Sequence, residues 1–259
     1  MVSGNRVMKQ KSKLIKFARC DRIISAGCDA NLINAQKSFV TNNKGRETDD
    51  FYRTPAPCTL ALCDELKRRG IEPTVILDVG CGDGAIGKVL GLSFPNAYIV
   101  GIEQDTRRFG LAEQGEIYAW MWLGDWVDSI CADVTPPNLI VSNPSFKHAL
   151  RFIELALARV RPSGHVAFLL PSQWHQETNQ DADGRPRERG RFLDKLRKPN
   201  GDEGYGVLEY EGRVDFRGNG NTDRITYTWY VFGPGFEGVH CRIPRYAPDP
   251  TERLSMGIV

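Results

Sequence analysis

The chain of 259 residues lacks a long apolar run, a strong net charge of either sign and any cluster of cysteines or histidines at the spacing of metal ligands. A helix that crosses a membrane needs about 20 consecutive apolar residues, so no such helix is predicted. The formal net charge is +2, and attraction to nucleic acid would therefore have to come from local clusters of lysine and arginine. The seven cysteines include no C-x-x-C pair and do not lie at ligand spacing from the four histidines, which argues against a bound metal.

Residues 1–49 include no apolar signal segment, and together with the cysteine pattern this predicts a reduced, cytoplasmic protein. Lysine and arginine are frequent in this part and no helical or strand period is sustained, which is typical of a solvated, flexible arm. An arm that contacts nucleic acid is the alternative. Over the whole chain, 41% of the residues are hydrophobic and 25% are charged, as in soluble globular proteins with a large core.

The sequence ILDVGCGDGAIG at residues 76–87 predicts a buried strand, a glycine-rich turn and the start of a helix. Gly80, Gly82 and Gly84 carry no side chain that would keep a ligand from the backbone, and a helix N-terminus directs free N–H groups toward such a ligand. One acid, Asp78, precedes the first glycine and another lies within the turn. Because carboxylates would repel the pyrophosphate of a dinucleotide, the turn suits a ligand with an amino group and hydroxyls. A purely structural turn is the alternative.

A second apolar run, Ala97–Ile102, predicts the next strand and is followed by Glu103. This acid lies about twenty residues after the glycine turn, the distance at which nucleotide-binding sheets place an acid for the ribose. A carboxylate offers paired acceptors for two neighbouring hydroxyls. Ribose binding is therefore the function predicted for Glu103, and an exposed acid at a strand end is the alternative.

The glycine turn resembles the first motif of class I S-adenosylmethionine-dependent methyltransferases. The resemblance implies that S-adenosylmethionine contacts Asp78, Gly80, Cys81 and Gly82. Upstream, the sequence FYRTP resembles the motif that precedes the cofactor strand in DNA amino-methyltransferases and closes over the methionine end of the cofactor. It implies cofactor contacts for Phe51, Tyr52, Thr54 and Pro55. An aromatic-anchored turn before a helix is the alternative.

The apolar run IYAWMWL predicts a strand that ends shortly before Asp125 and Trp126. A glycine, an acid and an aromatic residue in this order resemble the adenine pocket of the same family. The resemblance implies that Asp125 accepts a hydrogen bond from the exocyclic amine of the cofactor and that Trp126 packs against its ring. Asp133 is the alternative acid. Trp120 and Trp122 are large and apolar, and we expect them in the core.

A fourth strand is predicted just before the sequence NPSF, which would therefore lie at a carboxyl strand end, where open α/β sheets bind ligands. The four residues Asn143, Pro144, Ser145 and Phe146 resemble the motif of enzymes that methylate an amino nitrogen, in which Asp, Asn or Ser is followed by two prolines and Tyr or Phe. Ser145 departs from this motif, because the family usually has its second proline there. As a turn without a ligand, the sequence would be unremarkable.

The resemblance implies a chemistry for these residues. The exocyclic amine of a base is a poor nucleophile, because its lone pair is delocalised into the ring. If the side-chain oxygen of Asn143 and the carbonyl of Pro144 accept its N–H groups, the nitrogen is drawn toward tetrahedral geometry and its lone pair is directed at the methyl group. Phe146 would stack on the base outside the duplex. Asn143 also lies next to the expected cofactor, and its amide is no strong base, so the proton is expected to leave to water.

The rest of the chain continues the alternation of strands and helices. Residues 147–161 predict a helix, residues 165–170 a fifth strand and residues 207–232 the last two strands, joined by a loop rich in glycine and asparagine. The closing stretch resembles the tail of phage-type and prophage-type N6-adenine DNA methyltransferases. Residues 172–206 are polar and basic, and they are either a solvated segment or the part that recognises nucleic acid.

The predicted fold class is α/β, a Rossmann-like class I methyltransferase sheet that is mostly parallel, with seven strands, the last antiparallel, and helices on both faces. The predicted parts are the arm at residues 1–49, a catalytic domain at 50–240 and a tail at 241–259. The order of the motifs resembles the gamma arrangement. It implies a bacterial or phage protein that transfers a methyl group from S-adenosylmethionine to N6 of adenine in DNA. An RNA base amine or a protein glutamine as the target, and a non-catalytic protein that binds DNA or a partner, are the alternatives.

Overall fold

The computed structural model describes residues 52–126, 135–175, 187–214, 216 and 225–244. The predicted arm at residues 1–49, Phe51 and Asp133 lie outside these ranges. No helix within the described ranges combines the length and the apolar character that crossing a membrane requires.

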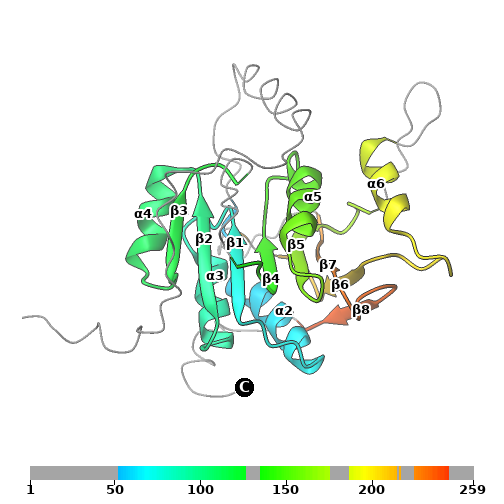
Figure 1. Cartoon of the computed structure of the whole chain (residues 1–259), viewed down its shortest axis with the longest axis horizontal. Helices are drawn as coiled ribbons and strands as arrows, with labels where there is room; N and C mark the ends of the chain where they lie inside the picture. The colour runs from blue at the N-terminus through cyan, green and yellow to red at the C-terminus, as the bar shows by residue number, and fades with distance from the viewer. Residues whose placement is uncertain (1–51, 127–134, 176–186, 215, 217–224, 245–259) are drawn as a thin grey trace, which may run out of the picture. The chain divides into compact units, whose positions relative to one another are not determined.

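Strands and helices alternate along most of the described chain (Figure 1). The elements are α2 (Ala56–Arg68), β1 (Val75–Val79), α3 (Ala85–Ser93), β2 (Tyr98–Glu103), α4 (Thr106–Gln114), β3 (Trp120–Leu123), β4 (Leu139–Ser142), α5 (Ala149–Arg159), β5 (His165–Pro171), α6 (Glu188–Leu196), β6 (Gly206–Tyr210), β7 (Tyr227–Phe232) and β8 (His240–Ile243). Helix α2 begins directly after its N-cap residue Pro55, and Pro57 lies in its first turn, where the fixed φ of proline is compatible with a helix.

The strands form a single eight-stranded sheet in the order β3-β2-β1-β4-β5-β7-β6-β8. Strand β7 runs antiparallel to both of its neighbours, β5 and β6. The remaining neighbours are parallel. A mostly parallel sheet with β7 inserted in the opposite direction confirms the predicted fold class.

The sheet has one strand more than the seven predicted. Strand β8 pairs with β6, with His240 opposite Val207. Its sequence, HCRI, contains neither an apolar run nor a regular alternation of apolar and polar residues, and only Ile243 is buried. The backbone of β6 offers a free edge, and pairing with that edge makes this segment a strand. Residues 241–243, which the sequence assigned to the C-terminal tail, therefore belong to the sheet.

The two faces of the sheet carry separate cores. Successive side chains of a strand point to opposite faces, so Ile76 of β1 packs into one core and Leu77 into the other. The first core includes the buried side chains of α2 and α3, among them Leu62 and Leu66. The second includes Ile153 of α5. Helices therefore cover both faces, as predicted.

The parallel strands β1, β2, β4 and β5 end at one edge of the sheet, the upper edge in Figure 1. The turn after β1 contains three glycines with positive φ, namely Gly80 (64°), Gly82 (59°) and Gly84 (84°). Glycine adopts this conformation without the steric cost that a side chain would add, and α3 begins directly after Gly84. The predicted order of strand, glycine turn and helix is confirmed.

The prediction that Trp120 and Trp122 belong to the core is wrong. Both lie on β3, at one end of the described sheet, and they are 56% and 37% exposed. Strand β3 has one neighbour in the described sheet, and α4 beside it buries only Ala112. A strand in this position offers its side chains few packing partners, so an apolar sequence alone does not place them in the interior.

Candidate active site

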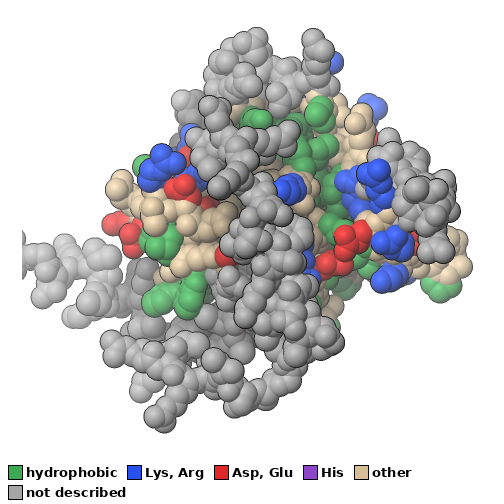
Figure 2. Space-filling model, turned by 90° about the horizontal axis from the view of Figure 1, so that it is seen from above, with side chains coloured by type: hydrophobic (Ala, Val, Ile, Leu, Met, Phe, Trp, Pro, Cys, Tyr) green, Lys and Arg blue, Asp and Glu red, His purple; other side chains and the backbone are tan. Residues whose placement is uncertain are grey.

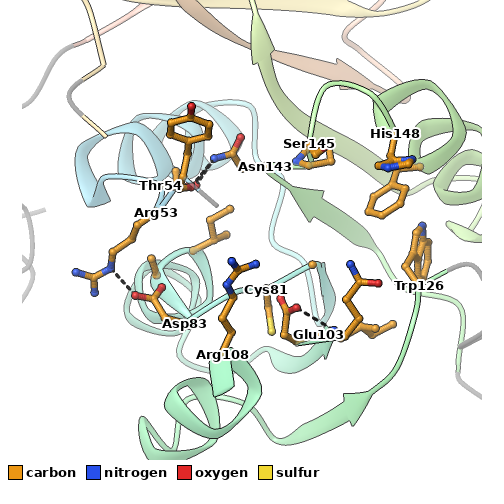
Figure 3. Close-up of a pocket in the computed structure, with 18 of the residues that line it drawn as sticks. Arg53, Thr54, Cys81, Asp83, Glu103, Arg108, Trp126, Asn143, Ser145 and His148 are labelled. Atoms are coloured by element: carbon orange, nitrogen blue, oxygen red, sulfur yellow. Dashed lines mark hydrogen bonds and ion pairs between the residues drawn. The ribbon is translucent and has the colours of Figure 1, made fainter. Parts of the chain in front are cut away.

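A pocket lies at the carboxyl edge of the sheet, where β1, β2, β3 and β4 end (Figure 3). Including the open solvent at its mouth, the pocket contains about 870 Å³ of space that is free of protein atoms. Ten of the residues predicted to bind the cofactor or the target line this pocket: Tyr52, Thr54, Gly80, Cys81, Glu103, Asp125, Trp126, Asn143, Pro144 and Ser145. The fold thus brings together five segments that are separated in the sequence.

Other predicted site residues lie outside the lining of this pocket. Pro55 caps α2, and Asp78 is fully buried in β1. Gly82 directs its N–H group at Glu103. Phe146 lines a second pocket, described below.

Glu103 holds the glycine turn in place. Its Oε2 accepts a hydrogen bond from the N–H group of Gly82 (2.7 Å), and its Oε1 accepts from Gln104 (2.9 Å) and Asp105 (2.8 Å). A carboxylate has about four acceptor positions, so these bonds leave about one, on Oε2. In this conformation Glu103 can therefore bind one ribose hydroxyl, whereas the sequence suggested two. Ribose binding by Glu103 stays a prediction.

Asp78 contacts a tyrosine that the sequence did not single out. The hydroxyl of Tyr118 donates to Oδ2 of Asp78 at 2.6 Å, and the tyrosine ring fits against Gly84, Gly87 and Gly101. A Cβ atom at Gly87 would lie 2.3 Å from the Tyr118 hydroxyl. The missing side chains of these glycines thus leave the space that the tyrosine ring occupies. No spacing in the sequence signals this contact, because Tyr118 lies in the segment before β3.

Burial raises the pKa of Asp78 from 3.8 to about 7. The hydrogen bond from Tyr118 acts in the opposite direction, and the nearby carboxylate of Glu103 raises the pKa further. Oδ1 of Asp78 is buried and has no hydrogen-bond partner in the described part of the chain. Near neutral pH the carboxyl group is therefore poised between its protonated and ionised forms.

This raised pKa predicts how stability depends on pH. Between pH 3.8 and about 7 the folded chain keeps the proton of Asp78 and the unfolded chain loses it. The free energy of unfolding should therefore fall as pH rises through this range, by up to about 4 kcal/mol from this group, and level off above it. Asp78→Asn should flatten the slope, because an amide resembles the protonated acid. Urea unfolding of the ligand-free protein at pH 4 to 8 measures this, with exposed Asp202→Asn as the control. An unchanged slope in Asp78→Asn would contradict the prediction.

Asn143 links the end of β4 to the segment before α2. Its side-chain nitrogen Nδ2 donates to the carbonyl oxygen of Tyr52 (3.1 Å) and to Oγ1 of Thr54 (3.0 Å). Figure 3 shows the amide nitrogen turned toward Thr54. Two predicted motifs, some ninety positions apart in the sequence, therefore meet through these hydrogen bonds.

A second, aromatic pocket adjoins the first. It is lined by Tyr52, Asn143, Pro144, Ser145, Phe146, Phe216 and Tyr227, and the first four of these also line the larger pocket. The rings of Phe146 and Tyr227 are 5.8 Å apart, and Phe216 meets Tyr227 edge-on at 4.6 Å. Phe146 is 40% exposed, which leaves part of its ring open to a ligand. The two pockets meet at Asn143–Ser145.

The part of the pocket predicted to hold adenine contains Asp125 and Trp126. The guanidinium of Arg159 lies 4.5 Å from the centre of the Trp126 ring. The indole Nε1 is buried and has no hydrogen-bond partner among the described residues. His148 lines the same pocket, and burial lowers the pKa of its imidazole, with Lys147 acting in the same direction and Asp125 against it.

The sequence did not predict several charged and aromatic residues of the large pocket, namely Arg53, Arg108, His148 and Phe152. Arg53 forms an ion pair with Asp83 of the glycine turn, with Nε and Oδ2 2.8 Å apart (Figure 3). Because Arg53 is 63% exposed, the pair is worth at most about 1 kcal/mol. Arg108 and His148 lie at the starts of helices that follow strands. Such positions face the carboxyl edge of the sheet, and this is the signal that could have found them.

Within the described ranges, no group of three or more His, Cys, Asp or Glu side chains is arranged to hold a metal ion.

No protein-family model matches the chain, and no curated protein sequence matches it. Among solved structures, a Pyrococcus horikoshii protein assigned as an RNA methyltransferase has a TM-score of 0.51 and 19% identity, with 79% of this chain and 98% of that chain covered. A Klebsiella pneumoniae protein assigned as an O-methyltransferase has a TM-score of 0.50 and 13% identity, with 79% and 96% covered. The O-methyltransferase TomG of Streptomyces achromogenes, in complex with S-adenosylmethionine, has a TM-score of 0.49 and 15% identity, with 82% and 93% covered.

The first two of these likenesses define the fold of the chain. Its described residues form the Rossmann-like sheet of class I methyltransferases, with helices on both faces. At such low identities the likeness concerns the fold, and the function must be argued from the pockets.

Proposed function

We propose that this protein is an S-adenosylmethionine-dependent methyltransferase whose target is the N6 amine of adenine in DNA. The observation that carries this proposal is the meeting of two pockets at Asn143–Ser145. One is lined by the glycine turn, Glu103 and Asp125, and the other by the rings of Phe146, Phe216 and Tyr227. Methyl transfer requires a donor and an acceptor on the two sides of one reacting centre, and this arrangement provides a place for each.

The large pocket fits the proposed cofactor. Gly80 has positive φ, and a Cβ atom there would meet no atom closer than 4.0 Å, so a ligand can approach the backbone. Glu103 retains an acceptor position for a ribose hydroxyl. Asp125 offers a carboxylate for the polar edge of adenine, and Trp126 beside it offers a ring surface. When bound, the cofactor supplies a methyl group on a positively charged sulfur.

The aromatic pocket fits a planar base. Phe146, Phe216 and Tyr227 offer ring surfaces for stacking, and a base in a duplex must leave the stack to reach them. The side-chain oxygen of Asn143 and the carbonyl of Pro144 would accept the two N–H groups of the exocyclic amine. These bonds hold the nitrogen in place with its lone pair toward the larger pocket. No strong base is required, because the methylated amine is acidic enough to lose its proton to water.

Basic side chains support nucleic acid as the target. Helix α6 and the residues beside it carry exposed Arg187, Arg191, Lys195, Arg197 and Lys198. Figure 2, which views the molecule from above the sheet edge, has Lys and Arg side chains gathered on the side of α6. Contacts of this kind bind phosphate groups and make affinity depend strongly on salt. Residues 176–186 of the predicted recognition segment lie outside the described ranges.

Incubation with methyl-labelled S-adenosylmethionine and unmethylated duplex DNA, followed by digestion to nucleosides, tests the proposal. The expected result is label in the N6-methyl derivative of deoxyadenosine. Label in RNA or in a protein glutamine instead would assign the site to another planar N–H₂ group, which the same pockets could accept. Cofactor binding without transfer to any of these targets would favour a non-catalytic binding protein.

Glu103→Ala should weaken the binding of S-adenosylmethionine by about 1.5–3 kcal/mol, the usual scale for hydrogen bonds to a charged group. The variant loses the proposed ribose contact and leaves the N–H group of Gly82 without its acceptor. Calorimetric titration with the cofactor measures the change. Glu113→Ala, on the exposed side of α4, is the matched control. An unchanged dissociation constant in Glu103→Ala would remove this residue from the site.

A further inference from the structure

The side-chain amide of Asn143 has one chemically allowed orientation. Its partner at 3.1 Å is the carbonyl oxygen of Tyr52, which can only accept a hydrogen bond. The amide group that faces this carbonyl must therefore be the N–H₂ group. Thr54 Oγ1, at 3.0 Å from the same nitrogen, offers a second acceptor. With both N–H groups engaged there, the amide oxygen is the atom left for other partners, and Figure 3 shows it turned away from Thr54.

The two acceptors are held by a well-anchored segment. Thr54 is only 5% exposed, and Pro55 directly after it caps α2. The first turn of α2 is fixed in turn by Trp229, whose indole Nε1 donates to the carbonyl of Cys58 at 2.9 Å. On the other side, Arg53 pairs with Asp83 of the glycine turn. The acceptors therefore do not depend on a ligand for their position.

We propose that Thr54 is a positioning residue, which together with the carbonyl of Tyr52 holds the Asn143 amide with its oxygen toward the acceptor amine. The inference rests on the proposed function. In the opposite orientation, the N–H₂ group of Asn143 would face the N–H groups of the target, and two donors cannot form a hydrogen bond. Residues 52–54, which resemble a cofactor-binding motif, thus also select which atom of Asn143 meets the target.

Two variants of Thr54 separate positioning from cofactor binding. Thr54→Val keeps the branched shape but removes the acceptor, and it should lower kcat by about 5- to 30-fold, the range that a lost hydrogen bond implies. The dissociation constant for S-adenosylmethionine should stay within about twofold, because the hydroxyl acts on Asn143. Thr54→Ser keeps the hydroxyl and should restore kcat to within about threefold of the wild type. An unchanged kcat in Thr54→Val, or a loss confined to cofactor affinity, would overturn the inference.

A measurement without any substrate tests the same contact. The side-chain N–H₂ resonances of Asn143 can be identified by NMR from their loss in Asn143→Ala. Their hydrogen exchange should be slowed in the wild type and in Thr54→Ser, and faster in Thr54→Val. If the wild type does not methylate DNA but this protection depends on Thr54, the proposed function fails and the orientation stands. If DNA is methylated and Thr54→Val alters neither kcat nor exchange, the orientation fails and the function stands.

Discussion

Asn143→Ala is expected to lower methyl transfer to DNA by about 1,000-fold or more, while the affinity for S-adenosylmethionine stays within about threefold of the wild type. Removing one group that stabilises charge in the transition state typically lowers kcat by about 100- to 1,000-fold. Here the loss is larger, because without the amide oxygen the target amine is neither held nor directed at the methyl group.

Cofactor affinity should change little, because the hydrogen bonds of the Asn143 side chain run to Tyr52 and Thr54. Single-turnover transfer of labelled methyl, together with calorimetric titration of the cofactor, separates the two quantities. Asn96→Ala is the matched control, since Asn96 is exposed in the turn before β2, at the opposite edge of the sheet. A large loss of cofactor binding in Asn143→Ala, or transfer at nearly the wild-type rate, would count against its assigned role.

Gly87→Ala is expected to destabilise the fold by about 3 kcal/mol, at the upper end of the usual cost of overpacking. The added Cβ atom would lie 2.3 Å from the hydroxyl oxygen of Tyr118 and 2.4 Å from its Cζ. The ring cannot easily move away, because its hydroxyl is bonded to the buried Asp78 and its edge already touches Gly101. Removing this steric clash would require breaking the 2.6 Å hydrogen bond from Tyr118 to Asp78 or shifting α3.

Gly110→Ala is the matched control. Gly110 also lies within a helix, α4, but a Cβ atom there would meet nothing within 4 Å. This change should stabilise the protein by about 0.5–1 kcal/mol, because alanine loses less conformational freedom than glycine on folding. Urea unfolding of both variants measures the difference. If the ring causes the loss, Gly87→Ala should cost much less in a Tyr118→Leu background than in the wild-type background. A Gly87→Ala protein as stable as the wild type would show that the ring is not held as described.

The sequence predicted the framework of the site well, because its signals are local. An apolar run followed by glycines specifies a strand and a turn, so β1, the glycine turn and the start of α3 were predicted from the pattern itself. Cys81 was added because the turn resembles a methyltransferase motif, and it lines the pocket. Glu103 and Asn143 were found for a related reason. Each stands just after or at the end of a buried parallel strand, and parallel strands bring their carboxyl ends to one edge.

Local patterns failed where a side chain depends on partners distant in sequence. Trp120 and Trp122 are as apolar as core residues, but their strand lies at one end of the described sheet and leaves them exposed. The sequence of β8 has no apolar pattern, and the segment becomes a strand because its backbone pairs with the edge of β6. Neither outcome can be derived without the order of the strands.

The sequence by itself determined the fold class, the glycine turn and the segments that contribute to the candidate site. The tertiary structure alone decided which atoms meet. It placed Thr54 against the amide of Asn143, Tyr118 against Asp78, and Phe216 with Tyr227 beside Phe146. The physical reason is that periodicity records which face of an element is buried, whereas a hydrogen bond or a ring contact depends on positions to within a fraction of an ångström. Such positions are set only when distant segments pack together.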